Sequence, residues 1–109
     1  MPAVGTLTDR VQLKRRIVSS EDEGGQAAMF TPIAYVWARV RQLSARAATD
    51  GDARGQAITH SVVMRFRSDF GPGDRIGYRG RDLDIAAASD LNGRRIYLSC
   101  TCSERVVTG

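Results

Sequence analysis

Apolar and polar residues alternate along most of this chain with a period of two, the pattern of half-buried β-strands. Val11, Leu13 and the pair Ile17-Val18 predict a first strand over about residues 10–18, interrupted by the basic residues 14–16. A stronger strand is predicted over residues 34–43. It places Val36, Ala38 and Val40 on one face and Tyr35, Trp37, Arg39 and Arg41 on the other. This second strand therefore has an amphipathic outer face.

Four more strands are predicted, at residues 58–67, 75–79, 82–88 and 94–102. The expected inward positions are Ile58, His60, Val62, Met64 and Phe66, then Leu83 and Ile85, then Ile96, Leu98, Cys100 and Cys102. Gly71–Asp74 breaks the third strand, the chain turns at Gly80, and Asn92-Gly93 is a hairpin signature. Six short strands with turn signals about every ten residues indicate an all-β fold, a small antiparallel barrel or sandwich of six to seven strands.

Two segments do not fit a strand pattern. Residues 19–32 are acidic and glycine-containing near their start, which is typical of a flexible surface loop. Residues 44–57 carry alanines that favour helix, but glycines and aspartates interrupt them. We therefore expect a long loop or a short helix between the second and third strands, within a single domain that spans residues 1–109.

Length and charge narrow the function classes. A chain of 109 residues and 11.9 kDa builds one core with little room for a deep cleft, so a large catalytic pocket is not expected. The net charge is +4, and all but one of the 16 basic residues are arginines. That excess fits a protein interface, a nucleic-acid surface or the codon usage of a GC-rich genome. The sequence contains no apolar run of membrane-spanning length and no signal peptide, so synthesis in the cytosol is expected.

Cys100 and Cys102 are the only candidates for metal or thiol chemistry. Their spacing places both thiols on one face of a strand, where they could form half of a zinc site with His60. Packing as small apolar residues is the simpler interpretation, because structural zinc sites favour longer spacings. Motifs for nucleophilic, phosphate-binding or dinucleotide chemistry do not occur, and neither an enzyme nor a cofactor is predicted.

The outer face of the second strand supports two interpretations. Tyr35 and Trp37 with Arg39 and Arg41 could form a stacking platform for single-stranded nucleic acid. The outer row of the next strand offers no further aromatic residue to complete such a platform. Aromatic and arginine residues are also enriched at subunit interfaces. This face is therefore a candidate for either kind of contact.

Several short motifs, taken in order, carry a family resemblance. They are Gly5-x-Leu7-x-x-Arg10-Val11, an acidic turn ending in Gly24-Gly25, Trp37-Ala38-x-Val40, Arg65-Phe66, Gly73-Asp74-Arg75-Ile76-x-Tyr78-x-Gly80-Arg81-x-Leu83-x-Ile85, and Asn92-Gly93. The ordered set resembles the head-tail joining (head-closure, or stopper) proteins of tailed bacteriophages and of gene transfer agents. The resemblance covers nearly the whole chain.

The resemblance implies a small β-barrel in the virion, made in the cytoplasm of a bacterial host, that assembles into a ring beneath the portal and adaptor. Such a ring retains double-stranded DNA without reading its sequence and docks the tail, with no membrane partner and no cofactor. A role as adaptor or tail terminator is a close alternative. The resemblance also implies structural roles in turns for Gly73, Asp74, Arg75, Gly80 and Arg81, and a supporting role for Trp37 and Val40.

Two hypotheses follow for the loops. Residues 44–57 depart from the helix of the family, so we expect a loop that gates DNA, with Arg46 and Arg54 near the phosphates and Asp50 and Asp52 limiting adhesion. The acidic residues Glu21, Asp22 and Glu23 are a candidate docking contact to a basic patch on a neighbouring ring. A solvated turn explains the same three residues equally well.

Overall fold

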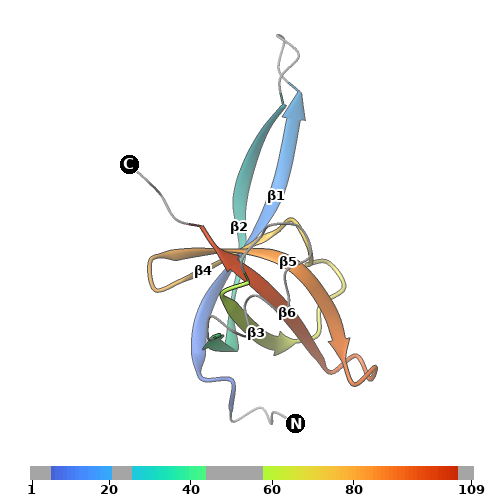
Figure 1. Ribbon diagram of the computed structural model, residues 1–109. Coiled ribbons are helices and arrows are strands. Elements are labelled where there is room, and N and C mark those ends of the chain that lie inside the picture. The colour runs from blue at the N-terminus through green and yellow to red at the C-terminus, as the bar shows by residue number, and fades with distance from the viewer. Residues whose placement is uncertain (1–5, 21–25, 44–57, 106–109) are drawn as a thin grey trace.

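Six antiparallel strands close into a small barrel in the computed structural model, which describes residues 6–20, 26–43 and 58–105 (Figure 1). The strands are β1 (Asp9–Ser20), β2 (Gln26–Gln42), β3 (His60–Arg65), β4 (Arg75–Tyr78), β5 (Arg81–Leu91) and β6 (Tyr97–Glu104). Their order around the barrel is β1-β2-β3-β6-β5-β4, and β4 pairs with β1 to close the sheet. The predicted all-β class is confirmed.

The core fills the barrel interior with alternate side chains from all six strands. Its fully buried members include Val11, Leu13, Val62, Met64, Ile76, Leu83, Cys100 and Cys102. The predicted alternation is confirmed at His60, Val62 and Met64 in β3 and at Leu83 and Ile85 in β5. The third strand is shorter than predicted, so Phe66 lies beyond its end and is only partly buried against the core. Because the sheet closes on itself, the strands have no row of unpaired backbone groups where they form the barrel wall.

The connection between β5 and β6 is a turn at the predicted position, but it is longer than a two-residue hairpin. Asn92 and Gly93 both adopt positive φ, 66° and 68°, as the Asn-Gly signature requires. The ladder resumes only at Tyr97, so the predicted strand start at residue 94 is wrong. Ile96, predicted to face inward, is 44% exposed, and Tyr97 is buried instead. The additional loop residues keep Ile96 outside the ladder.

The first hairpin is much longer than predicted. Residues 26–31, expected to belong to a flexible loop, are part of β2, and its ladder with β1 continues to the pair Ser20–Gln26. Beyond Lys14, β1 pairs with β2 and with no other strand of the described chain. We call residues 15–20 and 26–31 the arm. Figure 1 shows it projecting from the barrel, and the molecule is accordingly 48 Å long but only 30 and 26 Å across.

A β-bulge marks the point where the arm leaves the barrel. The register shifts between Leu13, opposite Ala34, and Lys14, opposite Pro32, so Ile33 is the extra residue. Bulges of this kind bend and twist the strand that carries them. The bulge thus redirects the hairpin away from the barrel while its strands remain paired.

Two further findings complete the fold. In the described part of the chain, no helix is long and apolar enough to cross a membrane. Residues 44–57, for which a long loop or a short helix was expected, lie outside the described residues.

Candidate functional site

Exposed apolar side chains are concentrated on one hairpin. Six large hydrophobic residues of the described chain are exposed, and five of them belong to β1 and β2. They are Ile17, Val18, Met29, Tyr35 and Trp37, and the sixth is Ile96. Clustered exposed apolar residues mark interaction surfaces, whereas isolated ones are common on any protein. The first hairpin is therefore the candidate functional region.

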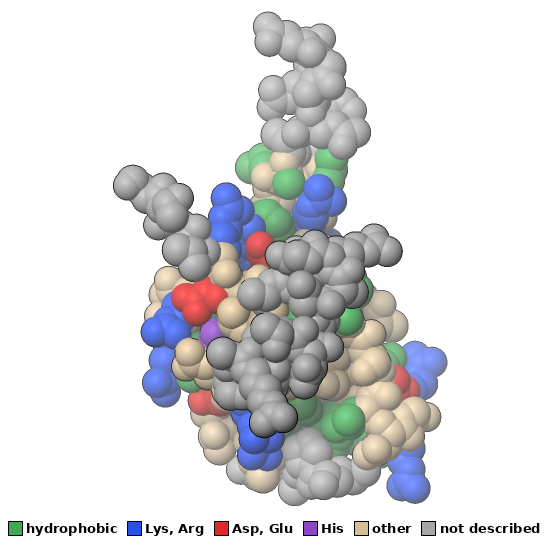
Figure 2. Space-filling model, in the orientation of Figure 1, with side chains coloured by type: hydrophobic (Ala, Val, Ile, Leu, Met, Phe, Trp, Pro, Cys, Tyr) green, Lys and Arg blue, Asp and Glu red, His purple; other side chains and the backbone are tan. Residues whose placement is uncertain are grey.

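The arm exposes apolar side chains on both faces of a two-stranded ribbon. Ile17 lies opposite Met29 on one face, and Val18 lies opposite Ala28 on the other. Met29 is 65% exposed, the highest value among these residues. Figure 2 shows apolar side chains along the arm and basic ones near its base. An isolated two-stranded ribbon is marginally stable in water, so the arm depends on contacts at its base.

Contacts at the base fasten the arm to the barrel. The guanidinium of Arg75, in β4, stacks 3.6 Å from the centre of the Phe30 ring. Its Nε also donates to Asp84 Oδ1 at 2.7 Å, which holds the stacked group in place. Arg15 forms an ion pair with Asp69 at 3.1 Å on the loop after β3. The side chain of Arg75 is only 11% exposed, so this resemblance-derived turn residue is an anchor of the arm as well.

Asp74 joins the arm to the turn before β4. Its two carboxylate oxygens accept from the backbone N–H groups of Arg16 and Gly71, each at 3.0 Å. Gly73 has φ +93°, which a side chain rarely tolerates, so the glycine permits this turn. The turn predicted from the Gly-Asp-Arg motif is therefore present, and it also positions the arm.

The second motif turn lies between β4 and β5. Arg79 and Gly80 both adopt positive φ there, 50° and 78°. Arg81 follows, exposed, with its guanidinium 3.8 Å from a carboxylate oxygen of Glu104. Gly80 therefore lies in this turn, and Arg81 is the first residue of β5.

Tyr35 and Trp37 form a row on the outer face of β2, as the alternation predicted. They are 62% and 53% exposed, and Arg39 and Arg41 continue the exposed row. Arg10, opposite Trp37 on β1, places its guanidinium 5.1 Å from the Trp37 ring and 5.7 Å from the Tyr35 ring. Sequence reasoning missed Arg10, because only the strand register brings it beside these rings.

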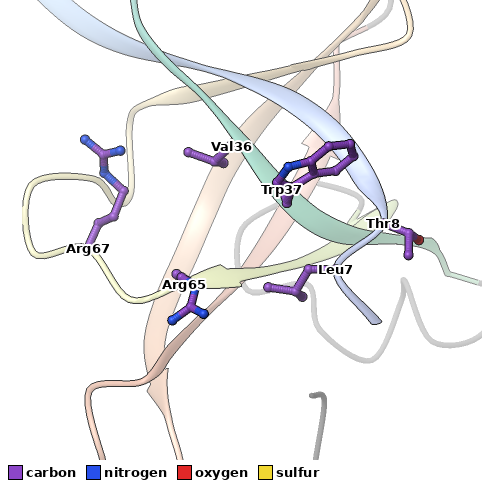
Figure 3. Close-up of a pocket in the computed structure, with 6 residues that line it drawn as sticks. All are labelled: Leu7, Thr8, Val36, Trp37, Arg65 and Arg67. Carbon is purple, nitrogen blue, oxygen red and sulfur yellow. The ribbon is translucent and has the colours of Figure 1, made fainter. Parts of the chain in front are cut away.

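An open apolar pocket lies beside this row. It encloses about 660 Å³ and is lined by Leu7, Thr8, Val36, Trp37, Arg65 and Arg67 (Figure 3). The β2–β3 ladder ends at the pair Ala38–Met64. Beyond this pair the two segments of the chain separate and leave the pocket between them. Arg67 is paired with Asp69 at 3.0 Å, whereas Arg65 forms no ion pair with any described residue. Among the described residues, the pocket thus combines an apolar wall with one cation, Arg65, that has no ion-pair partner.

The two residues given a supporting role differ in their surroundings. Val40 packs against the core, and its N–H donates to Asp9 Oδ2 at 2.9 Å. Trp37 instead lies on the outer face, half exposed, at the rim of the pocket. Trp37 therefore belongs to a surface and not to the barrel interior.

The cysteines and the histidine belong to the core. Cys100 and Cys102 are fully buried as free thiols, and burial raises the pKa of Cys100 to about 12. The pKa of Cys102 is raised further by burial and by the neighbouring Cys100 and Asp84. His60, opposite Cys102, contacts Thr59 Oγ1 through Nδ1 at 2.8 Å, and burial lowers its pKa. Within the described residues, no group of three potential ligands is close enough to hold a metal ion.

The remaining candidate residues lie outside the described part of the chain. They are Arg46, Asp50, Asp52 and Arg54 of the proposed gating loop and Glu21, Asp22 and Glu23 of the proposed docking loop. Besides Arg10 and the pocket lining, the residues that sequence reasoning missed are on the arm, above all Met29. An apolar segment on each side of an acidic, glycine-containing turn was the signal that could have revealed a hairpin there.

Solved structures share this fold over almost the whole chain. The solution structure of protein SF1141 from Shigella flexneri 2a matches with a TM-score of 0.74 at 23% identity, covering 98% of this chain and 100% of that one. A chain from the virion of a native gene transfer agent particle matches with a TM-score of 0.71 at 20% identity, with the same coverage. No curated protein matches the sequence significantly.

A family model completes the comparison. It matches residues 2–105 and describes phage head completion proteins, which are structural components and are not known as enzymes. The matched region includes the barrel, the arm and the pocket. The chain therefore belongs to the phage head completion protein family, the structural proteins of the virion head-tail region.

Proposed function

We propose that this protein forms a ring that closes the DNA-filled head of a phage or gene transfer agent particle and joins it to the tail. The ring lies beneath the portal or adaptor in this proposal and is the stopper of the connector. Family membership supports a place in the virion, and the shared fold with a chain of a gene transfer agent virion agrees with it.

One structural observation supports the formation of a ring in particular. Each subunit has two different apolar surfaces, the arm with Met29 and the pocket with Trp37, on separate parts of the molecule. A cyclic ring needs two such unlike faces, because each subunit contacts its neighbours through heterologous interfaces.

Particles that lack the protein provide the direct test. We expect heads that package DNA but lose it and carry no tails, with both defects restored by a complementing copy. Electron microscopy of particles and nuclease sensitivity of their DNA measure the two effects. Tailed, DNA-filled particles in the absence of the protein would refute the proposal, and a defect in tail length alone would indicate a tail terminator.

Retention of DNA is assigned to residues 44–57 in this proposal. Arg46 and Arg54 contact phosphates, and Asp50 and Asp52 limit adhesion so that the duplex can still leave. Deletion of residues 47–55 is expected to leave assembly intact while DNA leaks from the particles. Full retention by the deletion variant would remove the gating role but not the joining role.

Docking to the next ring is assigned to the acidic residues that connect β1 and β2. Reversal of charge at Glu21, Asp22 and Glu23 is expected to block joining of tails to filled heads. Glu21→Gln, Asp22→Asn and Glu23→Gln together are the matched control for length and polarity. Normal joining by the charge-reversed protein would leave these residues as a solvated turn.

The alternative function is binding of single-stranded nucleic acid at Tyr35 and Trp37. The exposure of both rings favours it, but the Arg10 guanidinium lies over them and occupies part of the stacking surface. Trp37 is the single tryptophan of the chain, so its fluorescence reports directly on this face. Quenching by short oligonucleotides at low salt would support this alternative, and an unchanged spectrum would exclude it.

A further inference from the structure

We propose that the arm of one subunit packs its apolar side chains into the Trp37 pocket of the next subunit. The inference rests on the proposed ring, because it specifies which surfaces form the contact between neighbouring copies. The occupant is thus a second copy of this chain, with the arm from one copy and the pocket from the other.

The arm has the properties of an element that is completed by a partner. Its ribbon is two strands wide, and in the described chain no third strand pairs with residues 15–20 or 26–31. Ile17 and Met29 form a continuous exposed apolar pair, 47% and 65% exposed, without a core beneath them. Such ribbons gain stability when a third surface covers them.

The pocket offers a matching apolar wall. Leu7, Val36 and Trp37 line it, and its volume of about 660 Å³ lies in the range of sites that bury apolar groups. Figure 3 shows Val36 and Trp37 on β2 and Leu7 on the chain before β1. The pocket therefore accepts branched or thioether side chains such as those of the arm.

The arm cannot reach the pocket of its own subunit. Met29 and Trp37 lie on the same strand, eight residues apart, which corresponds to about 26 Å of extended chain. Pairing with β1 along this whole length keeps the strand from folding back. The contact must therefore form between molecules.

Charge favours a second copy as the occupant. The sequence that follows β1 contains Glu21, Asp22 and Glu23, whereas the pocket side presents exposed Arg65 and the exposed row of Arg39 and Arg41. Arg15 and Arg16 lie at the base of the arm, so the acidic charge available to the arm is next to its outer end in sequence, and it is opposite in sign to the exposed cations on the pocket side. A head-to-tail contact of this type repeats around a ring, because each subunit gives its arm to one neighbour and its pocket to the other.

Cross-linking of variants with one added cysteine each tests the geometry in assembled particles. One variant carries Met29→Cys on the arm and the other carries Thr8→Cys at the pocket. Cys100 and Cys102 are fully buried and do not interfere with a bismaleimide reagent. We expect a covalent dimer only in particles that contain both variants, and a ladder beyond the dimer when one chain carries both cysteines.

The outcomes separate the contact from the ring itself. Efficient cross-linking of Met29→Cys by itself would overturn the inference in favour of an arm-to-arm contact. Absence of any cross-link in tailed particles that contain the protein would overturn it while leaving the proposed function intact. Absence of the protein from the particles would instead contradict the proposed function.

A charge substitution gives a second, independent readout. Met29→Glu is expected to reduce tail joining at least tenfold, because a carboxylate cannot be buried against the apolar wall. Ile96→Glu is the matched control, since Ile96 is also an exposed large apolar residue but lies away from the arm. Equal losses from both variants would contradict a specific role for the arm, and unchanged melting temperatures verify that both proteins fold.

Discussion

Strands β1 and β2 belong to both the barrel and the arm, but different contacts hold the two parts in place. Within the barrel, β1 is paired on both edges, and its side chains Val11 and Leu13 are 1% and 0% exposed. On the arm, β1 is paired on one edge, and Ile17 and Val18 are 47% and 42% exposed. Hydrophobic burial therefore stabilises one half of the strand, whereas the other half depends on its base.

The difference shows that an alternating pattern indicates a strand but not its environment. Leu13 and Ile17 are four residues apart on one strand, yet only Leu13 has the opposite wall of the barrel to pack against. Four comparisons between barrel and arm test this division, beginning with the largest expected effect.

Truncation of matched apolar residues should change the free energy of unfolding by different amounts in the two halves of β1. Leu13→Ala is expected to lower the free energy of unfolding by about 2–5 kcal/mol, since it leaves a cavity in a closed core. Ile17→Ala should change it by less than about 0.5 kcal/mol in the isolated subunit. Urea denaturation of both variants measures the contrast. Similar losses would mean that the arm contributes to the core after all.

Removal of the Asp74 carboxylate should weaken the junction of barrel and arm. Asp74→Ala leaves the N–H groups of Arg16 and Gly71 without their acceptors, at a cost of about 1–3 kcal/mol. Hydrogen exchange at the Arg16 amide should accelerate, while the amides of β3 and β6 change only with global stability. Asp74→Asn retains one acceptor oxygen, so its Arg16 exchange rate should lie between those of the wild type and Asp74→Ala. Unaltered exchange at Arg16 would show that the junction is held elsewhere.

Replacement of Arg75 by lysine should loosen the arm without removing the positive charge. Lysine can still form an ion pair with Asp84, but it lacks the planar group that stacks on Phe30. We expect a loss of about 0.5–2 kcal/mol and broader NMR signals for Phe30. Retention of wild-type stability would assign the role of Arg75 to its charge alone.

The ion pairs of Asp69 should give the smallest effect, visible through pH. The hydrogen bond from Arg67 is the main cause that lowers the pKa of Asp69 to about 2, with added contributions from its charge and that of Arg15. A lowered folded-state pKa gives stability that is present above about pH 4 and is lost as the pH falls toward 2. Asp69 is largely exposed, so the contribution stays below about 0.5 kcal/mol.

The comparison for this last prediction is Asp69→Asn, whose unfolding free energy is measured beside that of the wild type at pH 5 and pH 2.5. We expect the small advantage of the wild type at pH 5 to shrink at pH 2.5. Added salt should reduce it as well. A difference that grows on acidification would show that another group dominates.

Much of the fold could be predicted because it depends on local patterns. The inner row of β3, the alternation of β5 and the positive φ at Asn92 and Gly93 all followed from residue order. The end of the first hairpin could not be predicted in the same way. Its exposed apolar residues have no core, so the pattern alone predicts the acidic turn between them as the start of a long loop.

The candidate site was predictable only in part, for the same reason. The sequence indicated the exposed row of Tyr35, Trp37, Arg39 and Arg41, because alternation assigns residues to faces. It could not indicate that Arg10 covers the two rings or that Leu7 and Arg65 meet at a pocket. These neighbours come from different strands, and their approach is fixed by register.

The sequence by itself determined a small all-β domain, its turns and the family to which it belongs, because strand periodicity and turn residues act over a few neighbouring positions. Tertiary structure alone decided where the barrel closes and where the hairpin leaves it. Closure depends on pairing between β1 and β4, about 60 residues apart, and the bulge at Ile33 redirects the chain at that boundary. Long-range pairing thus separated a buried barrel from an exposed arm that one alternating pattern could not distinguish.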